Sequence, residues 1–218
     1  MTDPAHRLAQ IRGVIARTAR MARRDANDVT LIAVSKRRSA AEIEPMIAAG
    51  VSDFGENRVA EAAEKWPALK AAYPNTRLHM IGRLQSNKAG EAAMLFDTIH
   101  SLDRRSLLDA LVVAGERAAR FPAVYIQVNI GDEEQKGGVA LSDLPAFIEA
   151  VRATPLPLIG LMAMPPRGLD AGPYFALLAK LARRHGVEGL SIGMSSDFST
   201  AVMLGATAVR IGSALFED

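Results

Sequence analysis

The chain has 218 residues, of which 49% are hydrophobic, and its formal net charge is +2. This length and composition are typical of one large domain, and we expect a single domain over residues 1–218. The nearly balanced charge argues against a nucleic-acid-binding protein. Because there are 0 cysteines, disulfides and thiolate metal sites are excluded, which fits the reducing cytoplasm as the expected location.

The N-terminus gives no sign of a targeting segment. Residues 1–6 lack the basic and then apolar build of a secretory signal, and no apolar stretch is long enough to cross a bilayer. The arginines of the first predicted helix, 4–24, could lie on a membrane, but its apolar residues are small and mostly alanine. We therefore expect a solvated helix face and no membrane partner.

After this first helix, short apolar runs alternate with amphipathic stretches. The predicted strands are, in chain order, 30–35, 53–54, 77–81, 98–101, 123–130, 158–162, 189–192 and 208–211. The predicted helices between them are 40–49, 56–72, 86–95, 104–119, 141–153, 172–185 and 199–204. Several helices have a start signal, such as Ser39 before the second helix.

Strands that alternate with helices pair in parallel through right-handed crossovers. Eight such strands in a chain of this length predict a single (β/α)₈ TIM barrel with an extra N-terminal helix. The alternative is an open, doubly wound sheet, which favours a glycine-rich turn after its first strand. The residues found there are Ser35, Lys36, Arg37 and Arg38, so the barrel is preferred.

Lys36 follows a buried apolar run at the end of the first predicted strand. In a barrel of this type the strand ends open onto the face that carries the chemistry. Partial desolvation there would favour the neutral amine, which can form a Schiff base with an aldehyde. The alternative is a lysine that only reaches from a strand end into solvent.

Serine and glycine residues follow the last two predicted strands, where barrels often bind phosphate. Glycine lets the backbone approach an anion, and hydroxyl and free N–H groups donate to it. This predicts a phosphate site formed by Ser195, Ser196, Gly212 and Ser213. The alternative is a purely structural role, in which Ser196 and Asp197 cap a helix and Gly212 forms a tight turn.

Arg210 interrupts an otherwise apolar strand, and a buried guanidinium needs a partner. That partner could be a core carboxylate. Beside a Schiff-base lysine and a phosphate site, Arg210 could instead donate to a ring nitrogen of an aromatic cofactor. The four histidines are too scattered to suggest a metal site, and we expect none. His79 and His100 are predicted to be hydrogen-bonded residues of the core or of a pocket.

Several motifs occur in an order and spacing that together are highly specific, although each alone is weak. They are Ile32-Ala33-Val34-Ser35-Lys36, Phe54-Gly55-Glu56-Asn57, His79-Met80-Ile81-Gly82, Leu84-Gln85-Ser86-Asn87-Lys88, His100-Ser101-Leu102-Asp103, Gly160-Leu161-Met162-Ala163-Met164-Pro165, Gly193-Met194-Ser195 and Val209-Arg210-Ile211-Gly212. In these motifs the chain closely resembles the pyridoxal-phosphate homeostasis protein family, whose fold is the alanine racemase N-terminal barrel.

The resemblance implies pyridoxal 5′-phosphate (PLP) as the cofactor, bound covalently as an aldimine on Lys36. It implies that the phosphate is held by Ser195, Gly212 and Ser213, and that Arg210 faces the pyridine nitrogen. The remaining residues that the resemblance places at the cofactor are Asn57, Ile81, Gly82 and Met162. The chain departs from the family pattern at Leu78, Met80 and Arg83, and at the loop 135–138, which affects the pocket lining but not Lys36.

The predicted function is a PLP carrier or buffer that acts in intracellular vitamin B6 homeostasis and could pass PLP to dependent enzymes. An arginine cannot protonate the ring nitrogen, so the ring is a poor electron sink. Racemases with this feature use a tyrosine from an additional β domain, whereas this chain ends soon after the eighth strand. We therefore expect no catalytic residue, no strong activity and a monomer.

Two alternative functions remain open at this point. One is a PLP-dependent amino-acid racemase or an aldolase-like lyase, which would share every cofactor residue. The other is a phosphosugar-binding barrel in which Lys36 acts as an aldolase-type amine. Only the second alternative predicts no cofactor absorbance.

Overall fold

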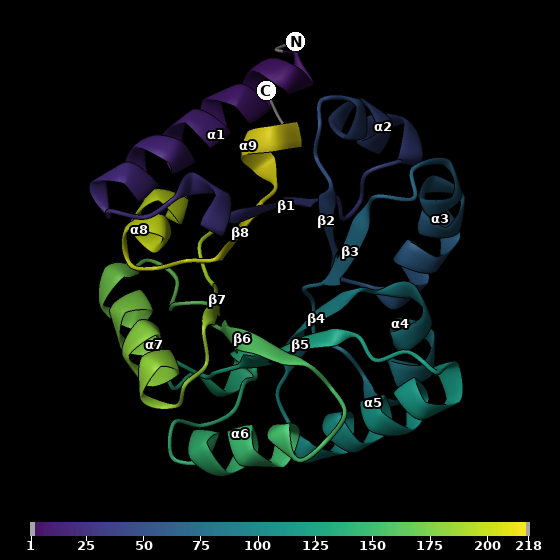
Figure 1. The fold of residues 1–218 in the computed structure, drawn as a ribbon, viewed down its shortest axis with the longest axis vertical. Helices are drawn as coiled ribbons and strands as arrows, with labels where there is room; N and C mark the ends of the chain where they lie inside the picture. Colours follow the sequence, from purple (N-terminus) through teal and green to yellow (C-terminus); the bar gives the residue numbers. More distant parts are fainter. Residues whose placement is uncertain (1–2, 217–218) are drawn as a thin grey trace.

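The computed structural model describes residues 3–216, apart from the side chain of Glu134. Its parallel strands form a closed barrel in the order β1 to β8, and the helices form a ring around it (Figure 1). The strands are β1 Thr30–Val34, β2 Asp53–Glu56, β3 Arg77–Met80, β4 Thr98–Leu102, β5 Ala123–Gln127, β6 Leu158–Met162, β7 Gly189–Ser191 and β8 Ala208–Ile211. The predicted TIM barrel is confirmed.

The helices alternate with these strands as predicted. They are α1 Pro4–Met21, α2 Ala40–Ala48, α3 Val59–Ala72, α4 Ala89–Leu95, α5 Arg105–Ala118, α6 Leu144–Arg152, α7 Gly172–Arg184, α8 Phe198–Met203 and α9 Ser213–Phe216, with short 3₁₀ turns at Ala26–Asp28, Ser86–Lys88 and Glu134–Lys136. Ser39 starts α2 through a reciprocal capping box with Glu42. Residues 1, 2, 217 and 218 of the predicted domain lie outside the described residues.

Several predicted boundaries differ from the structure by up to three residues, such as the end of the first helix, at Met21 and not at residue 24, and two of the differences have a clear cause. The third helix begins at Val59 and not at residue 56, because Glu56 ends β2 and its carboxylate is buried against Trp66. The fifth strand ends at Gln127 and not at residue 130, because the chain there turns to pair Val128 with Val139.

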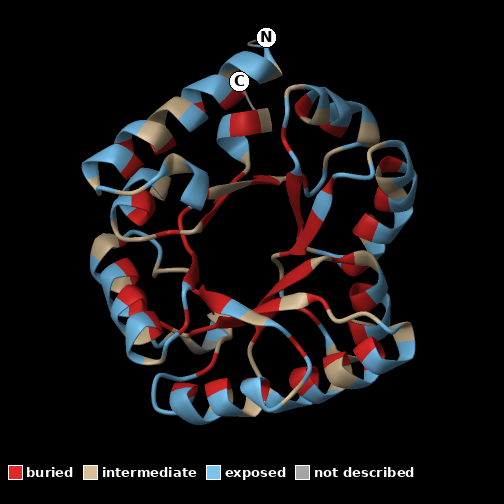
Figure 2. Cartoon of the chain, viewed as in Figure 1, coloured by how far each residue is buried: buried red, intermediate tan, exposed pale blue. Residues whose placement is uncertain are grey.

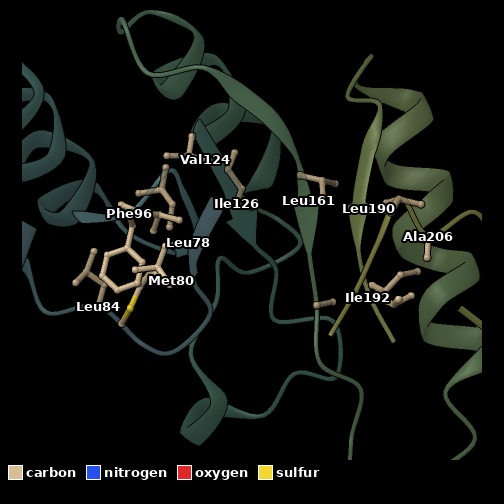
Figure 3. Packing of buried hydrophobic residues seen from close by; sticks show 14 of the residues in the cluster. Leu78, Met80, Leu84, Phe96, Val124, Ile126, Leu161, Leu190, Ile192 and Ala206 are labelled. Carbon is tan, nitrogen blue, oxygen red and sulfur yellow. The ribbon is translucent and has the colours of Figure 1, made fainter. Parts of the chain in front are cut away.

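The main hydrophobic core lies between the outer face of the barrel and the inner faces of the helices. In Figure 2 the strands are largely buried, and the helices carry exposed residues on their outer sides. Leu78 and Met80 of β3, for example, lie beside Leu84 and Phe96, and all four are almost fully buried (Figure 3). The core thus holds the strands in place and leaves their carboxyl ends to form one face.

The barrel closes where its first and last strands meet. Leu31 pairs with Val209 and Ala33 pairs with Ile211, both in parallel. The first helix, α1, packs against α8 and α9, so it covers this closure from outside (Figure 1). As a result, the residues that follow β1 lie next to the residues that follow β8.

Candidate functional site

The structure brings the predicted site residues to one end of the barrel. Parallel strands in a closed barrel present all their carboxyl ends at the same face. The residues at or just beyond these ends are Lys36 after β1, Asn57 after β2, Ile81 and Gly82 after β3, Met162 at the end of β6, Ser195 and Ser196 after β7, and Arg210, Gly212 and Ser213 at the end of β8 and the start of α9.

Lys36 lies in an exposed turn two residues beyond β1. The expected partial desolvation of its amine is therefore wrong for this structure. The reason is local: the Arg38 N–H donates to the Ser35 carbonyl at 3.1 Å, and Arg37 adopts a φ of 60°, which turns the chain outward. The amine is accessible to a ligand at the barrel end.

A buried carboxylate, which the sequence analysis missed, fixes the residue before Lys36. The Ser35 hydroxyl donates to Glu56 Oε1 at 2.6 Å, and the Trp66 indole donates to the same oxygen at 3.1 Å. The Glu56 side chain is 0% exposed, and it forms an ion pair of 2.9 Å with Lys65. A charge that is buried in this way must be paired, so Glu56 ties β2, α3 and the Lys36 turn together.

Lys65 holds the same turn from its other side. Its ammonium donates to the Ser35 carbonyl at 2.9 Å and to the Arg38 carbonyl at 3.0 Å. Glu61, one helical turn earlier, accepts from Lys65 at 3.1 Å and also from the Arg37 N–H. Burial alone would raise the pKa of Glu61, but these hydrogen bonds hold it below its ordinary value. The backbone around Lys36 is thus preorganised even though its side chain is exposed.

Arg210 is buried inside the barrel wall, as the sequence predicted. Its guanidinium donates to the Ser191 hydroxyl, to the Ser191 carbonyl at 2.7 Å and to the Ala163 carbonyl at 3.3 Å. Among the described residues these hydrogen-bond acceptors are all neutral, so the predicted core carboxylate is not found in contact. Burial lowers the pKa of Arg210 to about 10, which still leaves it charged at neutral pH.

A glycine and an aspartate determine the conformation of the loop after β7. Gly193 has a φ of 93°, which a side chain would strain. Asp197 occupies the N-cap position of α8, but its carboxylate accepts from the Met194 N–H at 2.7 Å instead of capping the helix. Ser195 is half-buried and Ser196 is exposed. Within the described residues, the backbone N–H groups of both serines have no hydrogen-bond partner and can donate to a ligand.

The segment after β8 presents a similar set of donors. Gly212 lies beside Val34, because a Cβ built on Gly212 would be 3.4 Å from the Val34 Cβ. Ser213 and Ala214 are exposed, and in the described part of the chain their N–H groups are not used by the backbone. These donors therefore directly follow β8, the neighbour of the strand that leads to Lys36.

The other predicted lining residues also reach the barrel end. The Ile81 side chain packs over Gly55 inside the barrel, where a Cβ on Gly55 would be 3.1 Å away. Gly82 touches the Asn57 backbone so closely that a Cβ would lie 2.2 Å from its carbonyl oxygen. The Asn57 Oδ1 atom is buried and has no partner among the described residues. Met162 is buried and is not part of the main core cluster.

A cavity of about 740 Å³ opens beside this end of the barrel. Asn57, Gly82, Arg83, Lys88 and Arg104 are among its lining residues. Lys88 pairs with Glu91 at 2.7 Å, and both side chains are largely solvated. The cavity thus extends the candidate site toward α3 and the β3–α4 connection.

Neither a metal site nor a membrane-spanning helix is found in the described residues. Within residues 3–216 no group of three or more histidine and acidic side chains is arranged to hold a metal ion. No helix in that part of the chain is long and apolar enough to cross a membrane. His79 and His100 are buried and hydrogen-bonded to each other at 3.0 Å, which confirms them as internal residues.

The sequence matches the family described as alanine racemase, N-terminal domain, over residues 8–218. It is 40% identical to the pyridoxal phosphate homeostasis protein of Pseudomonas aeruginosa, over 99% of this chain and 96% of the relative. It is 38% identical to the protein of the same name from Escherichia coli K12, over 99% and 97% of the two chains.

Solved structures of similar fold include proteins of this kind. PipY of Synechococcus elongatus with PLP bound is 36% identical, with a TM-score of 0.81 over 93% of this chain and 99% of that one. A D-threonine aldolase from Filomicrobium marinum has a TM-score of 0.70 but is only 18% identical, over 95% and 60% of the chains. The second likeness concerns the fold alone.

Proposed function

We propose, since this chain belongs to the pyridoxal phosphate homeostasis proteins within the alanine racemase N-terminal domain family, that it binds PLP and acts in PLP homeostasis. The observation that carries the proposal is the closure of the barrel. Pairing of β1 with β8 puts the turn of Lys36 next to the donors of Gly212 and Ser213. An amine beside an anion-binding segment suits a ligand that has both an aldehyde and a phosphate.

The aldehyde, the ring and the phosphate of PLP can each be matched to residues of the site. We assign Lys36 to a covalent Schiff base with the aldehyde, and Arg210 to the pyridine nitrogen as a hydrogen-bond donor. The phosphate is assigned to Ser195, Ser196, Gly212 and Ser213, which offer hydroxyl and free N–H groups. The ring is assigned to Asn57, Ile81, Gly82 and Met162. When bound, PLP supplies an electron-withdrawing ring to any amine that it holds.

The role we propose is that of a carrier or buffer without strong catalysis. Arg210 stays charged, so it can donate a hydrogen bond to the ring nitrogen but does not transfer its proton to it. The Lys36 turn is exposed, so water reaches the site. The relatives from Pseudomonas aeruginosa and Escherichia coli are named homeostasis proteins, whereas the aldolase is similar only in fold.

The test is reduction of the PLP-treated protein with borohydride, followed by absorbance and peptide mass spectrometry. We expect a visible or near-ultraviolet band and one adduct, on Lys36. Lys36→Ala should lose the adduct but retain measurable PLP binding through the phosphate donors. The matched control is Lys180→Ala, which removes an exposed lysine of α7 and should behave as the wild type. An adduct on another lysine, or none, would refute the assignment.

The competing function is an amino-acid racemase or aldolase-like lyase that uses the same lysine. Incubation of the PLP-loaded protein with the isomers of alanine, serine and threonine separates the two. A carrier gives no more turnover than free PLP at the same concentration. Turnover that is abolished by Lys36→Ala would establish the enzyme instead.

We further propose a single domain over residues 1–218, a cytoplasmic location, a monomeric state and PLP-dependent enzymes as the recipients of PLP. The absence of cysteine supports the reducing compartment. The continuous closed barrel supports the single domain. Light scattering of the purified protein tests the monomer.

A further inference from the structure

The interior of the barrel contains a set of buried polar side chains, of which the proposed PLP site uses only Arg210. Asp53, His79, His100, Ser191 and Arg210 come from β2, β3, β4, β7 and β8, and all are buried. Branched apolar residues usually fill such positions. A buried polar side chain is costly unless it is hydrogen-bonded, so the partners of these five residues explain how they are retained.

They form one continuous line of hydrogen bonds. The guanidinium of Arg210 contacts the hydroxyl of Ser191, and this hydroxyl lies 2.8 Å from Nδ1 of His100. Nε2 of His100 lies 3.0 Å from Nδ1 of His79. Nε2 of His79 lies 3.0 Å from Oδ1 of Asp53. The line thus crosses the barrel from the proposed cofactor end toward the start of β2.

At its far end the line reaches solvent. Arg77 donates to both carboxylate oxygens of Asp53, at 2.8 Å each, and 61% of its side chain is exposed. Ser52, Asp53 and Arg77 line a cavity of about 510 Å³ at the amino ends of the strands. A proton can therefore enter or leave the line at this opening, far from Lys36.

The ionised carboxylate of Asp53 fixes the direction of the bonds, because it can only accept. When both imidazoles are neutral, His79 therefore donates from Nε2 to Asp53 and accepts at Nδ1. His100 then carries its proton on Nε2, donates to Nδ1 of His79 and accepts at its own Nδ1. The donor to that nitrogen is the Ser191 hydroxyl, whose oxygen also accepts from Arg210.

One added proton reverses the line. If a proton from solvent binds His79, both of its nitrogens donate, one to Asp53 and one to His100. His100 must then accept on Nε2 and carry its proton on Nδ1, which donates to Ser191. The Ser191 oxygen then accepts from both His100 and Arg210, and its own hydrogen must point elsewhere. The hydrogen bonding of the residue that contacts Arg210 therefore changes, although the proton was added at the other end.

The charges around the line favour His79 as the place of that proton. Asp53 lies against His79 and is itself paired with Arg77. His100 faces the stacked ring of Tyr125, with 4.4 Å between centroids, and the positive Arg210 lies beyond Ser191. Burial, together with the charges of His79 and Arg210, holds the pKa of His100 well below its ordinary value, so His100 stays neutral.

We propose that His79, His100 and Ser191 are positioning residues of a proton-linked relay, which couples the Asp53–Arg77 pair, whose arginine is exposed to solvent, to the hydrogen bonding of Arg210. Only the effect of Arg210 on a bound ring rests on the proposed function. The relay itself is a property of the protein without cofactor.

The first test is therefore made on the cofactor-free protein, by nuclear magnetic resonance of ¹⁵N-labelled imidazoles. At neutral pH both His79 and His100 should carry their proton on Nε2. As the pH falls, His79 should gain a second proton while His100 switches from the Nε2–H to the Nδ1–H tautomer. Asp53→Asn, which keeps the shape but removes the charge, should abolish the switch.

The controls and the contrary result are equally direct. His6 is exposed and should titrate in the wild type and in Asp53→Asn alike. The relay is refuted if His100 carries Nδ1–H at neutral pH, or if His79 gains a proton while the tautomer of His100 is unchanged. Neither reading requires a bound ligand or a variant of the histidines.

The second test uses the protein with PLP. The pH midpoint of the cofactor absorbance should follow the protonation of His79 in the wild type, and this transition should be lost in His79→Gln, while the adduct on Lys36 persists. A midpoint that is unchanged in His79→Gln refutes the coupling to Arg210. If the wild type binds no PLP, the proposed function fails, and the first test still decides the relay.

Discussion

Glu56 is the residue on which the geometry around Lys36 depends. Its carboxylate is fully buried and is shared by Ser35, which follows β1, and by Lys65 and Trp66 of α3. Such a carboxylate stabilises the fold only together with its partners. If one side of the contact is removed, the other side becomes a buried polar group without a hydrogen bond.

We predict that Glu56→Ala lowers the free energy of unfolding by about 3–5 kcal/mol, because the buried Ser35 hydroxyl and Trp66 indole lose their acceptor and Lys65 keeps only Glu61 as an ionic partner. Urea unfolding followed by circular dichroism measures this. Glu64→Ala removes an exposed glutamate of the same helix and should leave the midpoint unchanged. A loss as small as that of the control would show that water replaces Glu56 as the partner of Lys65.

At this scale the sequence predicted the residues at strand ends and missed those that support them. Lys36, Ser195 and Arg210 could be found because each stands out against an apolar or glycine-containing run. Glu56 could not, because a glutamate between Gly55 and Asn57 is equally suited to a helix start. The contact of His79 with His100 depends on the side-by-side placement of two strands, which residue spacing along one chain does not reveal.

At the scale of elements, β5 and β6 are fitted together by one glycine. Gly160 on β6 faces Tyr125 on β5, and a Cβ added to Gly160 would lie 2.3 Å from Cε1 of Tyr125 and 2.5 Å from the Gly189 carbonyl oxygen. The register between β5 and β6 also shifts just before this pair. The absence of a side chain therefore lets Tyr125 stack on His100 within the barrel.

Gly160→Ala should consequently destabilise the protein by about 1–3 kcal/mol through overpacking. Gly90→Ala is the matched control with the opposite sign: a Cβ there meets nothing within 4 Å, and alanine is favoured in a helix by up to about 1 kcal/mol. Thermal unfolding of the two variants should shift in opposite directions. Equal shifts would mean that Tyr125 moves aside without cost.

The elements themselves were largely predictable, because buried parallel strands and amphipathic helices have distinct periods. The boundary of α3 was not, since helix propensity continues through Glu56, whereas in the fold Glu56 pairs with Met80 of β3 and its carboxylate is buried. Likewise, the apolar run suggested a strand up to Ser35, but β1 ends at Val34 because the chain turns there.

For the whole molecule, the amino end of the barrel determines the response to acid. Burial alone would raise the pKa of Asp53, but the hydrogen bonds from His79 and Arg77 hold it well below its ordinary value. Burial would likewise raise the pKa of Asp97, but Lys70, the Leu78 N–H and Arg120 hold it below its ordinary value. Both carboxylates therefore stabilise the fold only while they are ionised.

The sign follows from proton binding. Below about pH 4 the unfolded chain takes up protons on these two aspartates before the folded protein does, so stability falls as the pH is lowered through this range. Asp97→Asn should reduce the slope of the unfolding free energy against pH there, whereas Asp28→Asn, at an exposed site, should not. Urea midpoints measured from about pH 2 to about pH 6, a range that includes the ordinary aspartate pKa, test this. A slope that Asp97→Asn leaves unaltered would contradict the argument.

The meeting of β1 with β8 has a consequence for biosynthesis. Lys36 is synthesised long before Arg210 and Ser213, because it follows the first strand of the barrel and they lie in or just after the last. A nascent chain thus has a lysine amine long before it has the segment assigned to the phosphate. Binding of PLP of the kind proposed here can begin only after β8 has been made and has closed the barrel.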